Sequence, residues 1–350
     1  MSDGGAPLLS VEDLRVRFRT EDGVVQAVDG VSFTVDAGEV VAIVGESGSG
    51  KSVTSMTLMG LTRSPNATFE GSAHFEGVEL IRATDEQLRR IRGARIAMIF
   101  QDPMSSLDPV YRIGAQIAEQ IRAHENVSKD AALARAVELM ERVGIPRASE
   151  RARSYPHEFS GGMRQRVMIA MALSCSPSLL IADEPTTALD VTIQAQILDE
   201  LRRLRAESGT GIILVTHDLG VVADIADRVI VMYGGRVVEQ GTLDDLFYNP
   251  QHPYTWGLLG SITRIDSDRT RQLPAIGGSP PSLMSPPAGC HFRPRCPHEF
   301  AQCMQVPPLA ARVEGNPGHM DRCWLDPADK ERLRVVADGF GLASAEPVIS

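Results

Sequence analysis

Apolar and polar residues alternate near the start of the chain, over residues 8–44. The pattern is clearest at Leu14–Phe18 and at Val31–Val35, and polar turns interrupt it at Glu21-Asp22-Gly23 and Asp36-Ala37-Gly38. A period of two residues is typical of strands with one buried face. The sequence therefore predicts a small antiparallel sheet before residue 40.

Short runs that are almost wholly apolar follow, and they predict strands buried on both faces. These runs lie at 40–44, 96–100 and 179–184, and a fourth starts at Gly211. Two final strands are predicted at 228–233 and 236–239, joined by a Gly234-Gly235 hairpin. We also expect a hairpin around Glu76-Gly77, a short helix near 85–92 and an amphipathic helix that ends near Leu204.

Between residues 113 and 175 the apolar spacing changes to that of helices, as at Ile113, Ile117 and Ile121. Few strand patterns occur there. This predicts a helical subdomain, over about 105–175, inserted between strands of the main sheet.

Composition and charge narrow the class of protein. The 350 residues are 43% hydrophobic and 23% charged, as in an ordinary globular protein with room for one large and one smaller domain. The net charge of −10 argues against sequence-independent binding to nucleic-acid phosphates, so no nucleic-acid partner is expected. No run reaches the roughly 18–20 apolar residues of a membrane span, and the start lacks the features of an export signal. We expect a cytoplasmic protein that relies on other chains for any membrane span.

The first buried run leads into a phosphate-binding pattern, Gly45-x-x-x-x-Gly50-Lys51-Ser52. Glycines allow backbone N–H groups to point at an anion, and the helix that starts near Lys51 adds its positive end. Lys51 is suited to the β- and γ-phosphates, and the Ser52 hydroxyl to Mg²⁺. A tight structural turn is the alternative, but it does not account for the Lys and Ser in register.

Polar residues also follow the other buried runs. Gln101 follows one run and fits a contact with metal or water, although it could equally cap a turn. Asp183 and Glu184 end another, suited to holding the metal and polarising the attacking water. His217 ends the fourth, where it could sense a γ-phosphate, although a lone histidine is usually structural.

A second anion-binding helix start is predicted at Ser160-Gly161-Gly162. Ser160 can cap the helix, and the glycines leave its amide groups open. An ordinary capped helix would look the same. Such a site far along the chain from Lys51 makes sense if it completes the site of another subunit.

Four of the five cysteines, Cys290, Cys296, Cys303 and Cys323, lie close together in a proline-rich segment, while Cys175 follows an apolar helix. A reducing cytoplasm argues against disulfides. Four thiolates can hold zinc or a [4Fe–4S] cluster. The spacing leaves iron–sulfur, zinc and free thiols open. We interpret the neighbouring His291, His298 and His319 as surface residues.

Together these motifs resemble the ATP-binding-cassette ATPases over residues 8–250. The family fold implies an α/β, RecA-like P-loop NTPase core with an antiparallel β subdomain and an inserted helical subdomain; here a small cysteine-containing extension follows. The resemblance implies a head-to-tail dimer in which Ser160-Gly161-Gly162 closes over the partner's ATP. The family signature ends in Gln, where this chain has Met163.

The resemblance also assigns roles to residues. Catalysis is expected from Glu184, His217, Gln101 and Lys51, and Mg²⁺ binding from Ser52, Gln101 and Asp183. Phe18 is the candidate for stacking on adenine, or equally one more core residue of its strand. Nucleotide contacts are expected from Phe18, Gly45, Ser47, Gly48, Gly50, Lys51, Ser52, Val53, Ser160, Gly161, Gly162 and Asp190.

Within this family the chain is most similar to the ATPases of dipeptide and oligopeptide importers, with nickel importers close by. The stretches that carry this similarity are 27–33, 155–166 and the extension from Asn249 to Cys296. The resemblance implies two transmembrane permease subunits, a second ATPase chain, an extracytoplasmic peptide-binding protein and a place at the cytoplasmic face of the membrane. It also favours a [4Fe–4S] cluster at the four cysteines over zinc.

Other functions compete with this interpretation: import of nickel or another small solute, a soluble ABC ATPase of DNA repair or translation, or a P-loop kinase or GTPase. Soluble ABC ATPases typically have tandem cassettes or long coiled coils, and a kinase or GTPase leaves the Ser160 helix without a role. We expect a nucleotide domain over 1–250, the extension over 251–330 and a flexible tail over 331–350.

Overall fold

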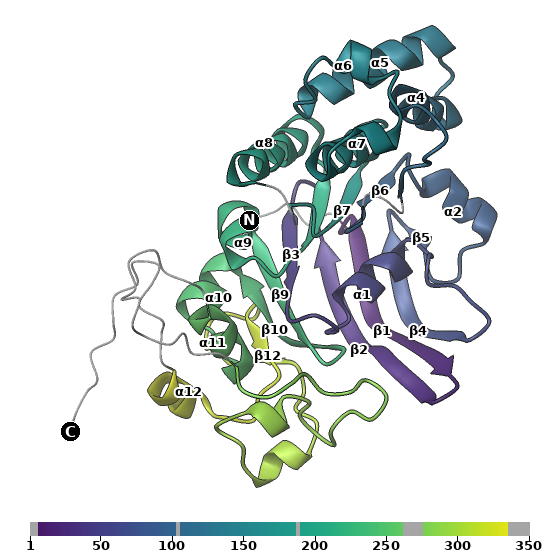
Figure 1. The fold of residues 1–350 in the computed structure, drawn as a ribbon. Helices are drawn as coiled ribbons and strands as arrows, with labels where there is room; N and C mark the ends of the chain where they lie inside the picture. Colours follow the sequence, from purple (N-terminus) through teal and green to yellow (C-terminus); the bar gives the residue numbers. More distant parts are fainter. Residues whose placement is uncertain (1–5, 103–105, 187–189, 262–275, 335–350) are drawn as a thin grey trace.

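Two β-sheets and a group of helices organise the chain in the computed structural model, which describes residues 6–102, 106–186, 190–261 and 276–334. The helices of the inserted subdomain lie together at one end of the main sheet (Figure 1). The described C-terminal residues, 276–334, lie at the other end. The α/β fold class that the family resemblance implied is confirmed.

The predicted antiparallel sheet is present, with the strand order β2-β1-β4-β5. It is built from β1 (Leu9–Thr20), β2 (Gly23–Val35), β4 (Ala67–Phe75) and β5 (Val78–Glu79). Strands β1 and β2 pair from Leu9–Val35 to Thr20–Gly23, so the turn falls at residues 21–22 as expected. The long β4, which pairs with β1, goes beyond the short hairpin that the sequence indicated.

The main sheet contains eight strands in the order β11-β12-β10-β9-β3-β8-β7-β6. Its parallel part consists of β9 (Arg228–Tyr233), β3 (Val40–Val44), β8 (Gly211–Val215), β7 (Leu179–Asp183) and β6 (Ile96–Ile99). All residues of β3, β7 and β8 are buried, as expected for strands covered on both faces. The carboxyl ends of β3, β6, β7 and β8 therefore meet at one edge, where ligands bind in such sheets.

Helices cover this sheet and form the inserted subdomain. Around the sheet lie α1 (Lys51–Leu58), α2 (Asp85–Ile91), α8 (Val191–Ser208) and α9 (Leu219–Ile225). The subdomain contains α4 (Ile113–His124), α5 (Lys129–Arg142), α6 (Ala148–Arg151), a 3-10 turn (Pro156–Glu158) and α7 (Gly161–Leu173). The buried faces of α4, α5 and α7 belong to one apolar cluster with the sheet. The helices that the sequence predicted between residues 113 and 175 are therefore present and packed against the sheet.

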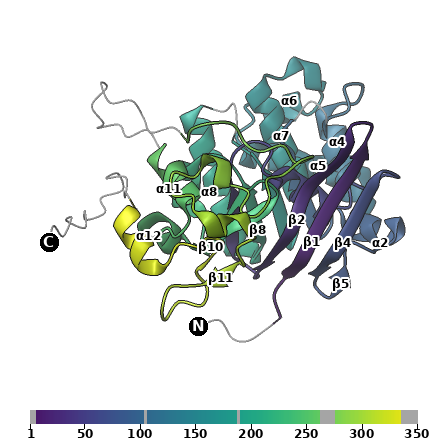
Figure 2. The same ribbon diagram turned by 90° about the horizontal axis from the view of Figure 1, so that it is seen from below.

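The extension after residue 250 is joined to the main sheet. It follows β10 (Arg236–Thr242) and α10 (Leu243–Tyr248), and contains α11 (Pro253–Gly260), 3-10 turns at Arg293–Arg295 and Ala301–Met304, β11 (Ala310–Ala311), β12 (Met320–Asp321) and α12 (Pro327–Leu333). Strand β12 pairs antiparallel with β10, and in Figure 2 the extension lies beside β10. The expected tail starts within α12, and residues 335–350 lie outside the described part of the chain.

Candidate functional site

The phosphate-binding loop between β3 and α1 has backbone angles that favour glycine. Gly45, Gly48 and Gly50 have φ values of 148°, 77° and 102°, a region that L side chains rarely adopt. A Cβ atom added to Gly45 would lie 2.2 Å from the Met232 carbonyl oxygen of β9. The loop is therefore packed against the neighbouring strand in a fixed shape.

Lys51 lies at the first position of α1 and points back into this loop. Its Nζ donates to the carbonyl oxygens of Gly45 at 2.7 Å and Glu46 at 2.9 Å. Burial lowers the pKa of Lys51, and the nearby carboxylates of Glu184 and Asp183 oppose that shift. The Lys51 ammonium thus lies inside the predicted phosphate-binding loop and donates to the loop's own carbonyl oxygens.

Ser52 and Asp183 are two of the three residues that the sequence assigned to Mg²⁺, and the third, Gln101, contacts Glu184. The Ser52 Oγ donates to Asp183 Oδ1 at 3.2 Å, although 131 residues separate them. Asp183 ends β7 and is only 2% exposed, and burial is the main cause that raises the pKa of its carboxyl. A hydroxyl beside a buried carboxyl offers the oxygen ligands that Mg²⁺ prefers, so the residues present fit this ion.

Glu184 is the centre of a polar triad with Gln101 and His217. Its Oε2 accepts a hydrogen bond from Gln101 Nε2 at 3.3 Å, and its Oε1 lies 3.1 Å from His217 Nδ1. The backbone of Glu184 has a φ of 49°, a conformation that costs energy for a non-glycine residue and that is common at active sites. The three strand-end residues that the sequence proposed independently do meet.

Two helix N-termini carry the remaining motif residues. Ser160 caps α7 by accepting from the Met163 N–H at 3.4 Å, and a Cβ at Gly161 would meet nothing within 4 Å. Asp190 caps α8 by accepting from the Ile193 N–H at 3.0 Å. Ser160 and Asp190 are both exposed. The start of α7 is therefore open to an approaching anion, as predicted.

Phe18 is half-buried on β1 and packs against the apolar cluster beneath the antiparallel sheet. This contact matches its interpretation as a core residue, while the stacking role stays a prediction. Val53 likewise packs against that cluster, whereas Ser47 and Gly48 are exposed at the tip of the loop.

The four clustered cysteines line one pocket in the extension. Cys290, Cys296, Cys303 and Cys323 are free thiols that share this pocket with apolar side chains such as Phe292 and Trp324. Burial raises the pKa of Cys296 to about 11 and of Cys323 to about 12. Within the described ranges, no group of three or more Cys, His, Asp or Glu residues is arranged to hold a metal ion.

The interpretation of the neighbouring histidines as surface residues is wrong for two of them. His291 is 6% exposed and its Nδ1 lies 2.7 Å from the Gly234 carbonyl oxygen, whereas His319 is 1% exposed. His298 is half-buried beside the Trp256 ring. Burial follows because the extension folds against the β9–β10 hairpin, and a local sequence pattern does not reveal that packing.

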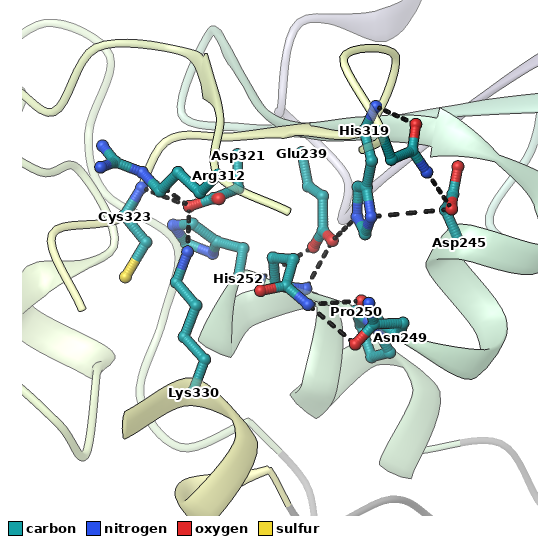
Figure 3. Close-up of polar contacts among 12 residues, drawn as sticks. Glu239, Asp245, Asn249, Pro250, His252, Arg312, His319, Asp321, Cys323 and Lys330 are labelled. Atoms are coloured by element: carbon teal, nitrogen blue, oxygen red, sulfur yellow. Dashed lines mark hydrogen bonds and ion pairs between the residues drawn. The ribbon is translucent and has the colours of Figure 1, made fainter. Parts of the chain in front are cut away.

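A buried polar network, defined here as Glu239, Asp245, His319, Asp321 and Lys330, joins β10 and α10 to the extension (Figure 3). Glu239 Oε1 lies 2.8 Å from His319 Nε2, with both side chains 0% exposed. Lys330 Nζ donates to Asp321 Oδ1 at 2.7 Å, with both side chains 1% exposed. These pairs satisfy charges that would otherwise be costly to bury.

Sequence reasoning missed three residues around the phosphate-binding loop. Arg295 of the extension forms an ion pair with Glu46 inside the loop, at 2.6 Å and 3.0 Å. The Glu46 amide donates to Tyr254 Oη at 2.8 Å. The one sequence signal for the contact with Arg295 was Glu46 itself. A carboxylate inside a phosphate-binding loop would repel phosphate, so a cationic partner could have been expected.

Comparison with known families agrees with this geometry. Residues 28–187 match the family described as ABC transporter, and residues 238–303 match the family described as oligopeptide/dipeptide transporter, C-terminal region. Among the described residues, no helix is both long and apolar enough to cross a membrane.

Similar proteins of known name cover nearly the whole chain. The oligopeptide transport ATP-binding protein OppD of Haemophilus influenzae is 53% identical over 93% of this chain and 99% of its own length. OppD of Escherichia coli is 52% identical over 91% and 93%. The dipeptide transport ATP-binding protein DppD of Bacillus subtilis is 50% identical over 95% and 98%.

Solved structures show the same cassette fold. The ATP-binding cassette MJ0796, in a dimeric post-hydrolysis state bound to ADP and Pi, matches with a TM-score of 0.62 and 27% identity, over 67% of this chain and 98% of that one. The sequence, the loop geometry and these similarities agree. This chain belongs to the ATPases of the ABC transporter family and, within it, to the oligopeptide and dipeptide transport ATP-binding proteins.

Proposed function

We propose that this chain hydrolyses ATP to drive the uptake of dipeptides or oligopeptides through a membrane importer. The observation that carries the proposal is that one chain combines the phosphate-binding site with the C-terminal region of oligopeptide and dipeptide transporters. Relatives at 50–53% identity are named for transport of these two kinds of peptide.

In the proposed reaction the loop amides and Lys51 hold the β- and γ-phosphates. For this, the Lys51 ammonium moves from the carbonyls of Gly45 and Glu46 to the phosphate oxygens. Ser52 and Asp183 would hold Mg²⁺, which when bound neutralises charge on the phosphates. The pair already lies within hydrogen-bond distance, so little rearrangement is needed.

Glu184 is the proposed group that polarises the attacking water. Gln101 and His217 contact both of its carboxylate oxygens and fix its orientation. His217 is well exposed, at 64% of its side chain, and so can reach a γ-phosphate in front of the sheet edge.

The second half of the site would come from another ATPase chain. Ser160, Gly161 and Gly162 lie at the open start of α7, where backbone amides can bind an anion of a facing subunit. A related cassette has been solved as a dimer with ADP and Pi. We propose that Asp190, at the start of α8, also lies at this interface.

Further subunits follow from the importer role. We propose two transmembrane permease subunits, a second ATPase chain in a heterodimer and an extracytoplasmic peptide-binding protein. This chain would then lie at the cytoplasmic face of the membrane, held there by the permeases. Residues 1–250 would form the nucleotide domain and 251–330 the extension specific to this group.

The test is reconstitution with the membrane proteins encoded beside this chain. We expect copurification with two permeases and uptake of labelled di- or tripeptides into vesicles that depends on ATP, which the Lys51→Ala variant abolishes. Uptake of nickel but not of peptides would identify a nickel importer. A fully active ATPase that binds no membrane protein would contradict the proposal.

For the four cysteines we propose a [4Fe–4S] cluster, with zinc as the alternative ion. The support is that four free thiols line one pocket and that the family resemblance favours iron–sulfur. Binding requires closer approach of the thiols than in the present structure. Because burial raises the pKa of Cys296 and Cys323, loading must displace protons.

Anaerobic purification followed by visible absorption and metal analysis tests this assignment. We expect broad visible absorption and about four iron atoms per chain, both lost in Cys296→Ser. One zinc without absorption would identify zinc, and a metal-free protein would show that the thiols serve packing alone.

A further inference from the structure

Arg295 connects the extension to the phosphate-binding loop. It lies in the short 3-10 helix Arg293–Arg295, yet its guanidinium reaches Glu46, 249 residues earlier in the chain. The two side chains face each other through two parallel contacts of 2.6 Å and 3.0 Å, the bidentate geometry of a strong ion pair. The Arg295 side chain is only 5% exposed.

Every N–H group of this guanidinium has an acceptor. Besides Glu46, Arg295 donates to the Gly277 carbonyl oxygen at 2.7 Å, to the Ile276 carbonyl oxygen at 3.1 Å and to Tyr233 Oη at 3.2 Å. Its charge also lies over the Tyr233 ring, 5.7 Å from the centroid. Five donors satisfied by five acceptors leave the arginine one orientation, so it acts as a rigid support.

A second residue outside the loop, Tyr254, also contacts Glu46. Tyr254 is fully buried, and its Oη accepts from the Glu46 amide at 2.8 Å. Phe292 of the extension packs against the rings of both Tyr254 and Tyr233, with centroids 5.4 Å and 5.2 Å apart. The side chain and the amide of Glu46 are thus both held by residues outside the loop.

This arrangement matters most when nucleotide binds. In the structure Lys51 also holds the carbonyls of Gly45 and Glu46, and it must leave them to reach the phosphates. The contacts from Arg295 and Tyr254 then remain to fix the Glu46 backbone. Arg295 also neutralises a carboxylate beside the triphosphate site, where an unpaired negative charge would repel the ligand.

We propose that Arg295 is a positioning residue for ATP binding: through Glu46, the extension holds the phosphate-binding loop in shape and cancels its negative charge. The proposal rests on the assignment of Gly45–Ser52 as the ATP site. The proposal gives the extension a role in ATP binding.

The test measures the dissociation constant of Mg·ATP for the full-length chain. Arg295→Ala should weaken binding about tenfold, within the usual range of coupling between sites. Glu46→Gln should change it by less than about threefold. The double variant Arg295→Ala/Glu46→Gln should bind ATP better than Arg295→Ala alone, because the unpaired carboxylate is gone. A purely structural role for Arg295 predicts no such recovery.

Kinetics and a matched control complete the test. Arg295→Ala should raise KM and leave kcat within about twofold, since it does not touch Glu184. Arg332→Ala, in the exposed Arg332–Asp329 pair of α12, should match wild type. If circular dichroism shows that Arg295→Ala does not fold, Arg295→Gln takes its place, with the same expected loss and the same recovery in the double variant.

Two results would overturn the proposal: an Arg295 variant that binds ATP within twofold of wild type, or a double variant no better than Arg295→Ala. Lys51→Ala separates this failure from failure of the site itself. If Lys51→Ala loses ATP while Arg295→Ala does not, only the coupling is wrong. If Lys51→Ala still binds ATP normally, the assigned site is wrong.

Discussion

The proposed nucleotide site and the buried polar network both contain charged side chains, but they arrange them differently. At the nucleotide site His217 is 64% exposed and faces Glu184 across the open sheet edge. In the network His319 and Glu239 are both 0% exposed, and the pair is enclosed by protein. The first arrangement leaves room for a ligand, whereas the second serves the attachment of the extension. The exposure of the paired side chains, rather than the number of charges, distinguishes the two.

Neutralising the Glu184 carboxylate should slow ATP hydrolysis without changing the fold. Glu184→Gln keeps the shape of the side chain and removes the group proposed to polarise water. We expect turnover to fall about 10²–10⁴-fold with ATP binding retained. Phosphate release and ATP binding by the same purified complex measure the two effects. Hydrolysis near the wild-type rate would exclude Glu184 from this role.

Breaking a pair in the buried polar network should instead lower the stability of the fold. Lys330→Met removes the ammonium partner of buried Asp321 and leaves only the longer contact with Arg312, 3.7 Å from Asp321 Oδ1. Breaking such a pair typically costs about 3–5 kcal/mol. The free energy of unfolding in urea measures the loss, and Arg332→Ala on the same helix, whose pair is exposed, should change it by less than about 1 kcal/mol. Equal effects of the two variants would show that burial does not distinguish these pairs.

Acid should weaken the extension through His252. Burial, with the charge of Lys330, lowers the pKa of His252 to about 3. The histidine therefore stays neutral when folded, while the unfolded chain takes up a proton below about pH 6.5. The stability from this group is complete above that pH and is lost as the pH falls from about 6.5 toward about 3.

The expected loss from His252 is about 1 kcal/mol between roughly pH 7 and 5.5. Urea unfolding at several pH values measures it. His252→Asn keeps an acceptor for the Tyr254 N–H, which His252 Nδ1 contacts at 3.1 Å, but it does not titrate. The same pH dependence in both proteins would contradict the assignment.

The smallest effect concerns Phe18, whose two interpretations make different predictions. If its ring stacks on adenine, Phe18→Leu should raise KM for ATP about fivefold, equivalent to about 1 kcal/mol of aromatic contact, and Phe18→Tyr should bind normally. As a core residue alone, Phe18→Leu should leave KM unchanged and alter only thermal stability.

Local patterns predicted that the proposed site residues lie close together because these residues follow strands that are themselves visible in the sequence. Asp183, Glu184 and His217 each come at or just beyond the end of a short apolar run, and parallel strand ends meet at one edge. The parallel order of these strands brings together residues as distant as Ser52 and Asp183.

The attachment of the extension could not be predicted in this way. Strand β12 has two residues, too few for a periodic pattern, and pairs with β10 about 80 positions earlier. The surface position expected for His319 was wrong, because its partner Glu239 lies 80 positions earlier and no local pattern reveals that contact. The contact between Arg295 and Glu46 spans still more of the chain. Such pairs become visible only when the packing is known.

The central claim is that this chain is one half of an ATP-binding clamp, and turnover of the assembled transporter tests it most directly. The measurement compares wild type with Ser160→Arg, placed in this chain and at the matching serine of its partner ATPase. Ser160 is exposed at the start of α7, so the substitution should spare the fold and ATP binding at Lys51. We predict that hydrolysis falls at least about 100-fold, as when one transition-state donor is removed. Hydrolysis at the wild-type rate in the intact complex would contradict the account.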